Sequence, residues 1–192
     1  MIFLSCNQSS QSNANNQKPS SERKEVDLKE IMLTETKLGN LALNKLSEIN
    51  ILNEIKAIYP EFSVVKSVEQ QDGPDFNLYR ITYSEDEIFF ISMDSNDTII
   101  LNDLWTNNKI IKDEYRVTVG QKIENVLEKR PTLKFHSDLH RNIYATDNNS
   151  KIEYRLKGNF KSLNDTTFFA KDYSVEKWQT DGMEIEYLIW RK

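Results

Sequence analysis

Short apolar runs separated by short polar turns restrict the fold of this chain more than any other feature. Between residues 61 and 105 the runs are EFSVVKSVEQ, NLYRITYS, IFFISMD and TIILNDLW, and the segments between them are DGP, EDE and SND. Runs rich in β-branched and aromatic residues, bounded by Asp, Asn, Gly and Pro, are typical of strands. Since tight turns join antiparallel neighbours, this region predicts an antiparallel meander.

Two helical patterns precede strand-like runs. Ser47 is the expected cap of INILNEIKAIYP, which Pro60 ends, and VTVGQKIENVLEKRP ends at Pro131. Further strand candidates are TLKFHSD, NIYATDN, KIEYRLKG and the final MEIEYLIWRK. The pattern predicts an α+β domain over residues 26–192, with two helices packed on a largely antiparallel sheet. The repeated order raises the hypothesis of two α-β-β-β repeats, about 47–105 and 119–192, although the same order also arises by chance.

Composition excludes several functional classes. The chain has 192 residues, of which 38% are apolar, enough for one domain with a core. Its net charge is −5 and its Lys and Arg are scattered, so nucleic acid is not an expected partner. One cysteine cannot form an intramolecular disulfide, and no apolar run approaches the roughly 18 residues that span a bilayer.

That single cysteine, Cys6, follows FLS and precedes a long polar run. A cysteine after a small residue and an apolar segment resembles a bacterial lipobox, whose cysteine is acylated. Residues 1–5 would then be the remainder of a signal peptide, with the true start upstream. Residues 6–25 are mostly Asn, Gln and Ser, which predicts a lipidated, disordered tether. Asn7 favours the outer membrane, with the domain facing the periplasm. The alternative is a cytoplasmic protein with an exposed thiol.

Several segments together resemble a known family. They are LGNL (residues 38–41), YPEF (59–62), IILNDLW, YRVTVGQKIENVLEK (115–129) and the closing IWRK. Their order is similar to that of the RpoE-regulated lipoprotein family of Gram-negative bacteria, a domain of unknown function. The resemblance implies an envelope-anchored lipoprotein linked to envelope stress, and it supplies no catalytic residues.

The segment HSDLH is the sharpest candidate for chemistry. On a strand, His136, Asp138 and His140 would project to one side, and two imidazoles with a carboxylate can bind a metal that keeps an open position. The alternative function is therefore a metal-assisted hydrolase. Against it, the segment has no evident fourth ligand and leads into a polar loop.

Aromatic residues near the C-terminus suggest a binding surface instead. Phe168, Phe169, Tyr173 and Trp178 follow no clean period, so they are candidates for an exposed patch. The leading expectation is a non-enzymatic envelope lipoprotein that binds an envelope protein partner. It would need no cofactor and would contact the membrane only through its lipid anchor. The oligomeric state stays open.

Overall fold

The computed structural model describes residues 26–192 except 71–73, 95–100, 139 and 160–172. The predicted signal remnant and tether, residues 1–25, lie outside the described part. None of the helices in that part is long and apolar enough to cross a membrane.

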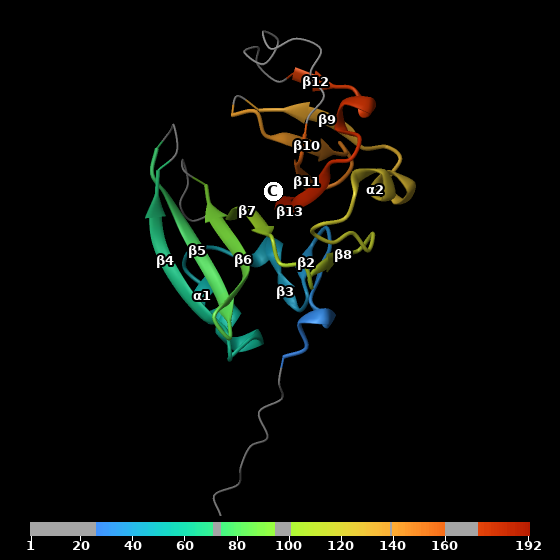
Figure 1. Cartoon of the computed structure of the whole chain (residues 1–192). Coiled ribbons are helices and arrows are strands. Elements are labelled where there is room, and N and C mark those ends of the chain that lie inside the picture. Colours follow the sequence, from blue (N-terminus) through green and yellow to red (C-terminus); the bar gives the residue numbers. More distant parts are fainter. Residues whose placement is uncertain (1–25, 71–73, 95–100, 139, 160–172) are drawn as a thin grey trace, which may run out of the picture.

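A nine-stranded sheet forms most of the molecule, in the order β12-β9-β10-β11-β13-β7-β6-β5-β4. Its first half is an antiparallel meander of β4 (Ser63–Glu69), β5 (Phe76–Tyr83), β6 (Asp86–Met93) and β7 (Leu101–Thr106). Figure 1 shows these strands in teal to yellow-green on one side of the molecule. The meander predicted from the alternating runs is therefore confirmed.

The second half of the sheet is also antiparallel. Its strands are β9 (Lys134–Ser137), β10 (Ile143–Thr146), β11 (Ile152–Lys157), β12 (Tyr173–Val175) and β13 (Glu184–Arg191). Strand β13 pairs with both β11 and β7, so the final strand of the chain joins the two halves. Strand β12 pairs with β9 at the outer edge of this half.

A second sheet of four two-residue strands has the order β3-β2-β1-β8. Its members are β1 (Met32–Leu33), β2 (Lys37–Leu38), β3 (Leu41–Ala42) and β8 (Lys112–Asp113). The helices are α1 (Ile51–Ile58) and α2 (Ile123–Lys129), with short 3-10 turns at η1 (Leu28–Glu30), η2 (Leu43–Lys45) and η4 (Lys177–Thr180).

The two sheets share one hydrophobic core, to which the helices contribute little. Buried Leu33 and Leu38 of the small sheet belong to the same cluster as Leu104 and Trp190 of the large one. Trp190 also donates its indole N–H to the backbone oxygen of Glu35, 2.9 Å away, in the turn between β1 and β2. The helices add five buried side chains, Ile51, Ile55, Ile123, Val126 and Leu127.

The predicted fold class, α+β with two helices packed on a sheet, is therefore wrong. The molecule is mostly β, a sandwich of a large and a small sheet with helices of eight and seven residues. Helix α2 is short because the residues before it make other backbone bonds. Gly120 donates its N–H to Ile185 and Gln121 accepts the N–H of Ile185, which ties this segment to β13 rather than to α2. The segments proposed as α-β-β-β repeats each contain a helix followed by more than three strands.

Two of the family-like segments meet in space. Tyr59, which ends α1, donates its hydroxyl hydrogen to the backbone oxygen of Leu38 at 3.1 Å and accepts the N–H of Asn40 at 3.3 Å. Between them Gly39 turns the chain with a φ of +56°, and a Cβ there would overlap the Tyr59 hydroxyl. Only glycine adopts this positive φ and leaves room for the Tyr59 hydroxyl without strain. The LGNL turn and the YPEF corner thus form one structural unit.

Candidate functional site

The face of the large sheet that points away from the core carries a continuous set of aromatic and charged side chains. Cross-strand pairing sets Phe90 of β6 opposite Trp105 of β7, and Trp105 opposite Ile189 of β13. Farther along, Tyr187 lies opposite Arg155, and Arg155 opposite Tyr144. Because side chains opposite one another share a face, these residues line one surface, called here the open face.

A groove of about 590 Å³ crosses the middle of the open face. Strands β5 and β6 and the residues beside them contribute Pro74, Phe76, Ser92 and Met93. The central strands β7 and β13 contribute Asp103, Trp105, Tyr187, Ile189 and Arg191, and the far side contributes His140, Tyr144 and Arg155. The groove is therefore apolar along one side and rich in Arg and Tyr along the other. Its volume lies in the range of sites that hold a small ligand.

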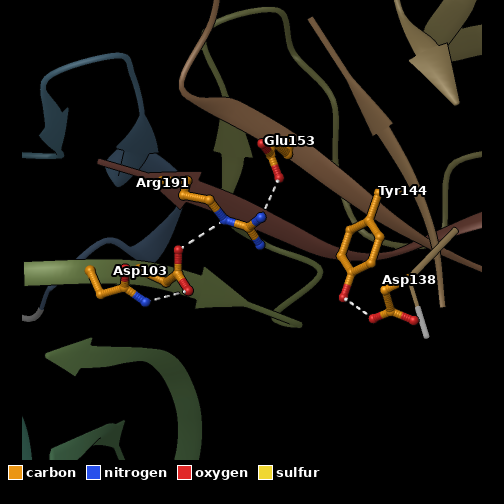
Figure 2. A network of polar contacts seen from close by, with 6 residues as sticks. Asp103, Asp138, Tyr144, Glu153 and Arg191 are labelled. Atoms are coloured by element: carbon orange, nitrogen blue, oxygen red, sulfur yellow. Dashed lines mark hydrogen bonds and ion pairs between the residues drawn. The ribbon is translucent and has the colours of Figure 1, made fainter. Parts of the chain in front are cut away.

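Arg191 is the electrostatic centre of this groove (Figure 2). Its Nε donates to Asp103 Oδ1 at 3.0 Å, and its Nη1 lies 3.4 Å from Glu153 Oε2. Asn102 donates its side-chain N–H to the other oxygen of Asp103 at 3.0 Å. Burial raises the pKa of both carboxyl groups, and Arg191 partly offsets that rise. The guanidinium group is thereby held between two carboxylates that come from different strands.

Arginine and aromatic side chains alternate over the open face. Phe90 and Trp105 stack with centroids 5.6 Å apart and 11° between their planes, and Arg80 lies 5.8 Å from the Phe90 centroid. Arg155 lies 5.4 Å from the Tyr187 centroid, while its Nε is 3.0 Å from Glu186. Stacking and ion pairing limit the rotamers of these long side chains, so less entropy remains to be lost when a ligand binds.

Asp138 of the HSDLH segment closes a turn after β9. Asp138 accepts hydrogen bonds from the N–H groups of His140 and Asn142, from the Asn142 amide and from the Tyr144 hydroxyl, at 2.8 to 3.2 Å. Burial alone would raise the pKa of Asp138, but the bonds from Asn142, His140 and Tyr144 leave it below its usual value. His136 stacks on Tyr144 instead, with centroids 5.4 Å apart. Within the described residues no group of three or more His, Cys, Asp and Glu side chains could hold a metal ion.

The remaining predicted residues fall mainly outside the described part. Cys6, Phe168 and Phe169 lie in segments that the structure does not describe. Tyr173 begins β12 and its backbone pairs with Ser137, and Trp178 lies in η4.

Sequence reasoning missed the residues at the centre of the groove, Asp103, Arg155, Tyr187 and Arg191. Alternation was only a partial signal for Tyr187 and Arg191, which lie beside buried Leu188 and Trp190, because Ile189 between these two is buried as well. A register shift opposite Arg155 moves Ile185 into the core, so strict alternation fails at that end of β13.

Comparison with known proteins places the fold but not the function. No family model matches this chain, and no curated protein matches its sequence. Among solved structures, the chain is similar to the crystal structure of the uncharacterized protein yfeY from Escherichia coli, with a TM-score of 0.57 and 11% sequence identity. The match covers 84% of this chain and 99% of the other. At this identity the likeness shows a shared fold alone.

Proposed function

We propose that this protein is an envelope lipoprotein that binds a protein partner through the groove of its open face and catalyses no reaction. In this proposal it belongs to the RpoE-regulated lipoprotein family and responds to envelope stress. Acylated Cys6 anchors it to the outer membrane, and the polar segment after Cys6 lets the domain face the periplasm. The FLSC motif, the composition of residues 7–25 and the family-like segments support this part.

The groove is the observation that supports a binding role. Residues at the centre of protein interfaces are enriched in Trp, Tyr and Arg, and these types supply Trp105, Tyr144, Tyr187, Arg155 and Arg191 here. Their contacts hold them in place before any partner arrives. The competing hydrolase hypothesis has less support, because the Asp138 carboxylate is already occupied by four hydrogen bonds.

Site-specific photocrosslinking in cells tests the binding role. A photoreactive residue replaces Tyr187 in the groove of the full-length precursor, and a matched one replaces exposed Glu128 in α2. We expect a discrete crosslinked product at position 187 that is absent at position 128. Equal products at both positions, or none at 187, would contradict the proposal.

Once the crosslinked protein is identified, purified components provide the quantitative test. Arg155→Ala and Tyr187→Ala should each weaken binding by about tenfold or more, the loss typical of central interface residues. Glu128→Ala should leave the affinity unchanged. Affinities that do not change in the two groove variants would show that the partner docks elsewhere.

Metabolic labelling tests the anchor separately. A precursor with its native upstream region should incorporate a labelled fatty acid and fractionate with the outer membrane, whereas Cys6→Ser should do neither. An unlabelled, water-soluble wild-type protein would refute the proposed location.

A further inference from the structure

The centre of the groove holds two carboxyl groups for one guanidinium group. Asp103 and Glu153 approach Arg191 from opposite sides (Figure 2), with Asp103 Oδ1 3.0 Å from its Nε and Glu153 Oε2 3.4 Å from its Nη1. The side chains of Asp103 and Glu153 are only 21% and 16% exposed, so water screens their charges poorly. When both carboxyl groups are ionised, one negative charge has no positive partner.

The protein stabilises that excess charge weakly. Glu153 Oε2 is buried and accepts no hydrogen bond from the described residues. Burial raises the pKa of both carboxyl groups, and the neighbouring charge of Asp103 adds to the rise at Glu153. Arg191 offsets the rise only in part. Native proteins seldom leave a buried acceptor unsatisfied, so a donor from outside the chain is the simplest way to complete this cluster.

The other charges beside the groove do not supply the missing cation. Arg155 has its Nε 3.0 Å from Glu186, and its guanidinium group lies 5.4 Å from the Tyr187 centroid. Asp138, which accepts the Tyr144 hydroxyl hydrogen, adds a further negative charge on that side. The whole chain carries a net charge of −5. Electrostatic complementarity therefore favours a partner that presents a positive charge.

Aromatic side chains stand where a basic side chain would enter. Trp105 lies two residues after Asp103 on β7, so both project from the same face of the strand. The Trp105 ring is held on one side by its stack on Phe90. Phe76 and Met93 line the same groove. Aromatic faces attract ammonium and guanidinium groups, and apolar walls pack against the methylene groups of long basic side chains.

We propose that the partner inserts a lysine or arginine side chain into the groove, with its charged end beside Asp103 and its methylene groups against Trp105 and Phe76. Because the proposed function assigns a partner to this groove, the proposal rests on it and names the chemistry that the partner presents. A partner without a cation here would bury the excess carboxylate more deeply and leave it unpaired, which is costly.

Small probes test this chemistry before any partner is known. Nα-acetyl-lysine amide carries the cation, Nα-acetyl-norleucine amide has nearly the same shape without it, and Nα-acetyl-glutamate amide carries the opposite charge. NMR titration of the full chain, produced without lipidation, follows the indole N–H signal of Trp105, assigned with Trp105→Phe. We expect only the lysine probe to shift this signal, saturably and in the millimolar range. The indole of Trp190, which donates to Glu35, is the internal control and should not respond.

Two kinds of variant change the charge of the cluster in opposite directions. Glu153→Gln and Asp103→Asn each remove the excess negative charge, so each should raise the dissociation constant of the lysine probe by about tenfold. Arg191→Met leaves two carboxyl groups without a cation, so it should lower that constant by about tenfold. Glu128→Gln, on the exposed side of α2, is the matched control and should leave it unchanged.

Three results would overturn this inference. They are a norleucine or glutamate probe that shifts the Trp105 signal as strongly as the lysine probe, no shift by the lysine probe at high millimolar concentration, and a lysine probe that binds Glu153→Gln and Asp103→Asn as tightly as wild type. Weaker binding to Arg191→Met would also overturn it, since a merely structural role of Arg191 predicts that outcome.

Failure of this inference and failure of the proposed function are distinguishable. If the lysine probe does not bind but position 187 still crosslinks to a partner, the cation is wrong and the binding role stands. If the lysine probe binds as expected but no product forms at position 187, the groove recognises a cation and the proposed protein partner is refuted.

Discussion

Removing one buried hydroxyl, in Tyr154→Phe, should destabilise this protein more than almost any other single-atom change. The Tyr154 hydroxyl donates to Asp113 Oδ2 at 2.5 Å and accepts from Arg130 Nη1 at 2.9 Å. All three side chains are buried. The hydroxyl therefore bridges a buried cation and a buried carboxyl group, between α2, β8 and β11.

The magnitude follows from those two bonds. A hydrogen bond to a charged group contributes about 1.5 to 3 kcal/mol, and a buried charge that loses its partner costs about 3 to 5 kcal/mol. Other contacts persist, since Asp113 still accepts the N–H of Val117 and Arg130 still lies 4.2 Å from the Tyr115 centroid. We therefore expect the free energy of unfolding to fall by about 3 to 5 kcal/mol, a large part of the roughly 5 to 15 kcal/mol of a typical domain.

Urea denaturation at pH 7 measures this loss, with Tyr187→Phe on the open face as the matched control. The control should change the free energy of unfolding by less than about 0.5 kcal/mol, as surface substitutions usually do. The slope of the free energy of unfolding against urea concentration should be equal for wild type, Tyr154→Phe and Tyr187→Phe if only stability changes. A loss below about 1 kcal/mol in Tyr154→Phe would refute the bridging role.

The pH dependence gives a second test of the same bridge. Burial raises the pKa of Asp113 above its ordinary value of 3.8. The stability that this carboxyl group contributes is therefore complete below pH 3.8, and it is lost as the pH rises through the pKa of Asp113 in the folded protein. Without the Tyr154 donor that pKa rises further. The difference in the free energy of unfolding between wild type and Tyr154→Phe should therefore be larger at pH 7 than at pH 4.

Three further predictions concern the fold and the groove. Gly39→Ala should destabilise the protein, because alanine is strained at this positive φ and its Cβ overlaps the Tyr59 hydroxyl. Tyr59→Phe should relieve that overlap. A double-mutant cycle measured by urea denaturation should therefore give a coupling free energy of about 1 kcal/mol or more. The pKa of Asp138 is lowered, so the stability that this carboxylate contributes is present above pH 3.8 and is lost on acidification. Asp138→Asn should therefore lower the free energy of unfolding at pH 7, and the free energy of unfolding of this variant should decline less than that of wild type below pH 4. Arg191→Met should raise the pKa values of Asp103 and Glu153 further. The stability of this variant should therefore fall more steeply than that of wild type as the pH rises above 4. Thermal melts across a pH series measure this difference.

Short runs of β-branched and aromatic residues between polar turns predicted the strands of the first meander correctly. The runs around Tyr79, Phe89 and Leu104 combine β-branched and aromatic residues with polar turns, and each forms a strand of the first meander. The helical patterns were less informative, and before α2 the reason is that Gly120 and Gln121 make backbone bonds with Ile185 of β13. The pairing of the small sheet was not predicted, since strands of two residues are too short to show a period.

The candidate site illustrates the same limit. Local sequence drew attention to His136, Asp138 and His140, which lie close together along the chain, yet in the structure Asp138 closes a turn and His136 stacks on Tyr144. The aromatic segment around Phe169 lies outside the described residues.

By itself, the sequence determined which residues form most strands of the large sheet, because runs of β-branched and aromatic residues bounded by polar turns are a local property of the chain. Only the tertiary structure decided that β13 pairs with β7. That pairing brings Arg191 to Asp103, 88 residues away along the chain, and both side chains line the groove. Strand pairing depends on how the whole set of apolar faces is buried together, and no local pattern in the sequence records that choice.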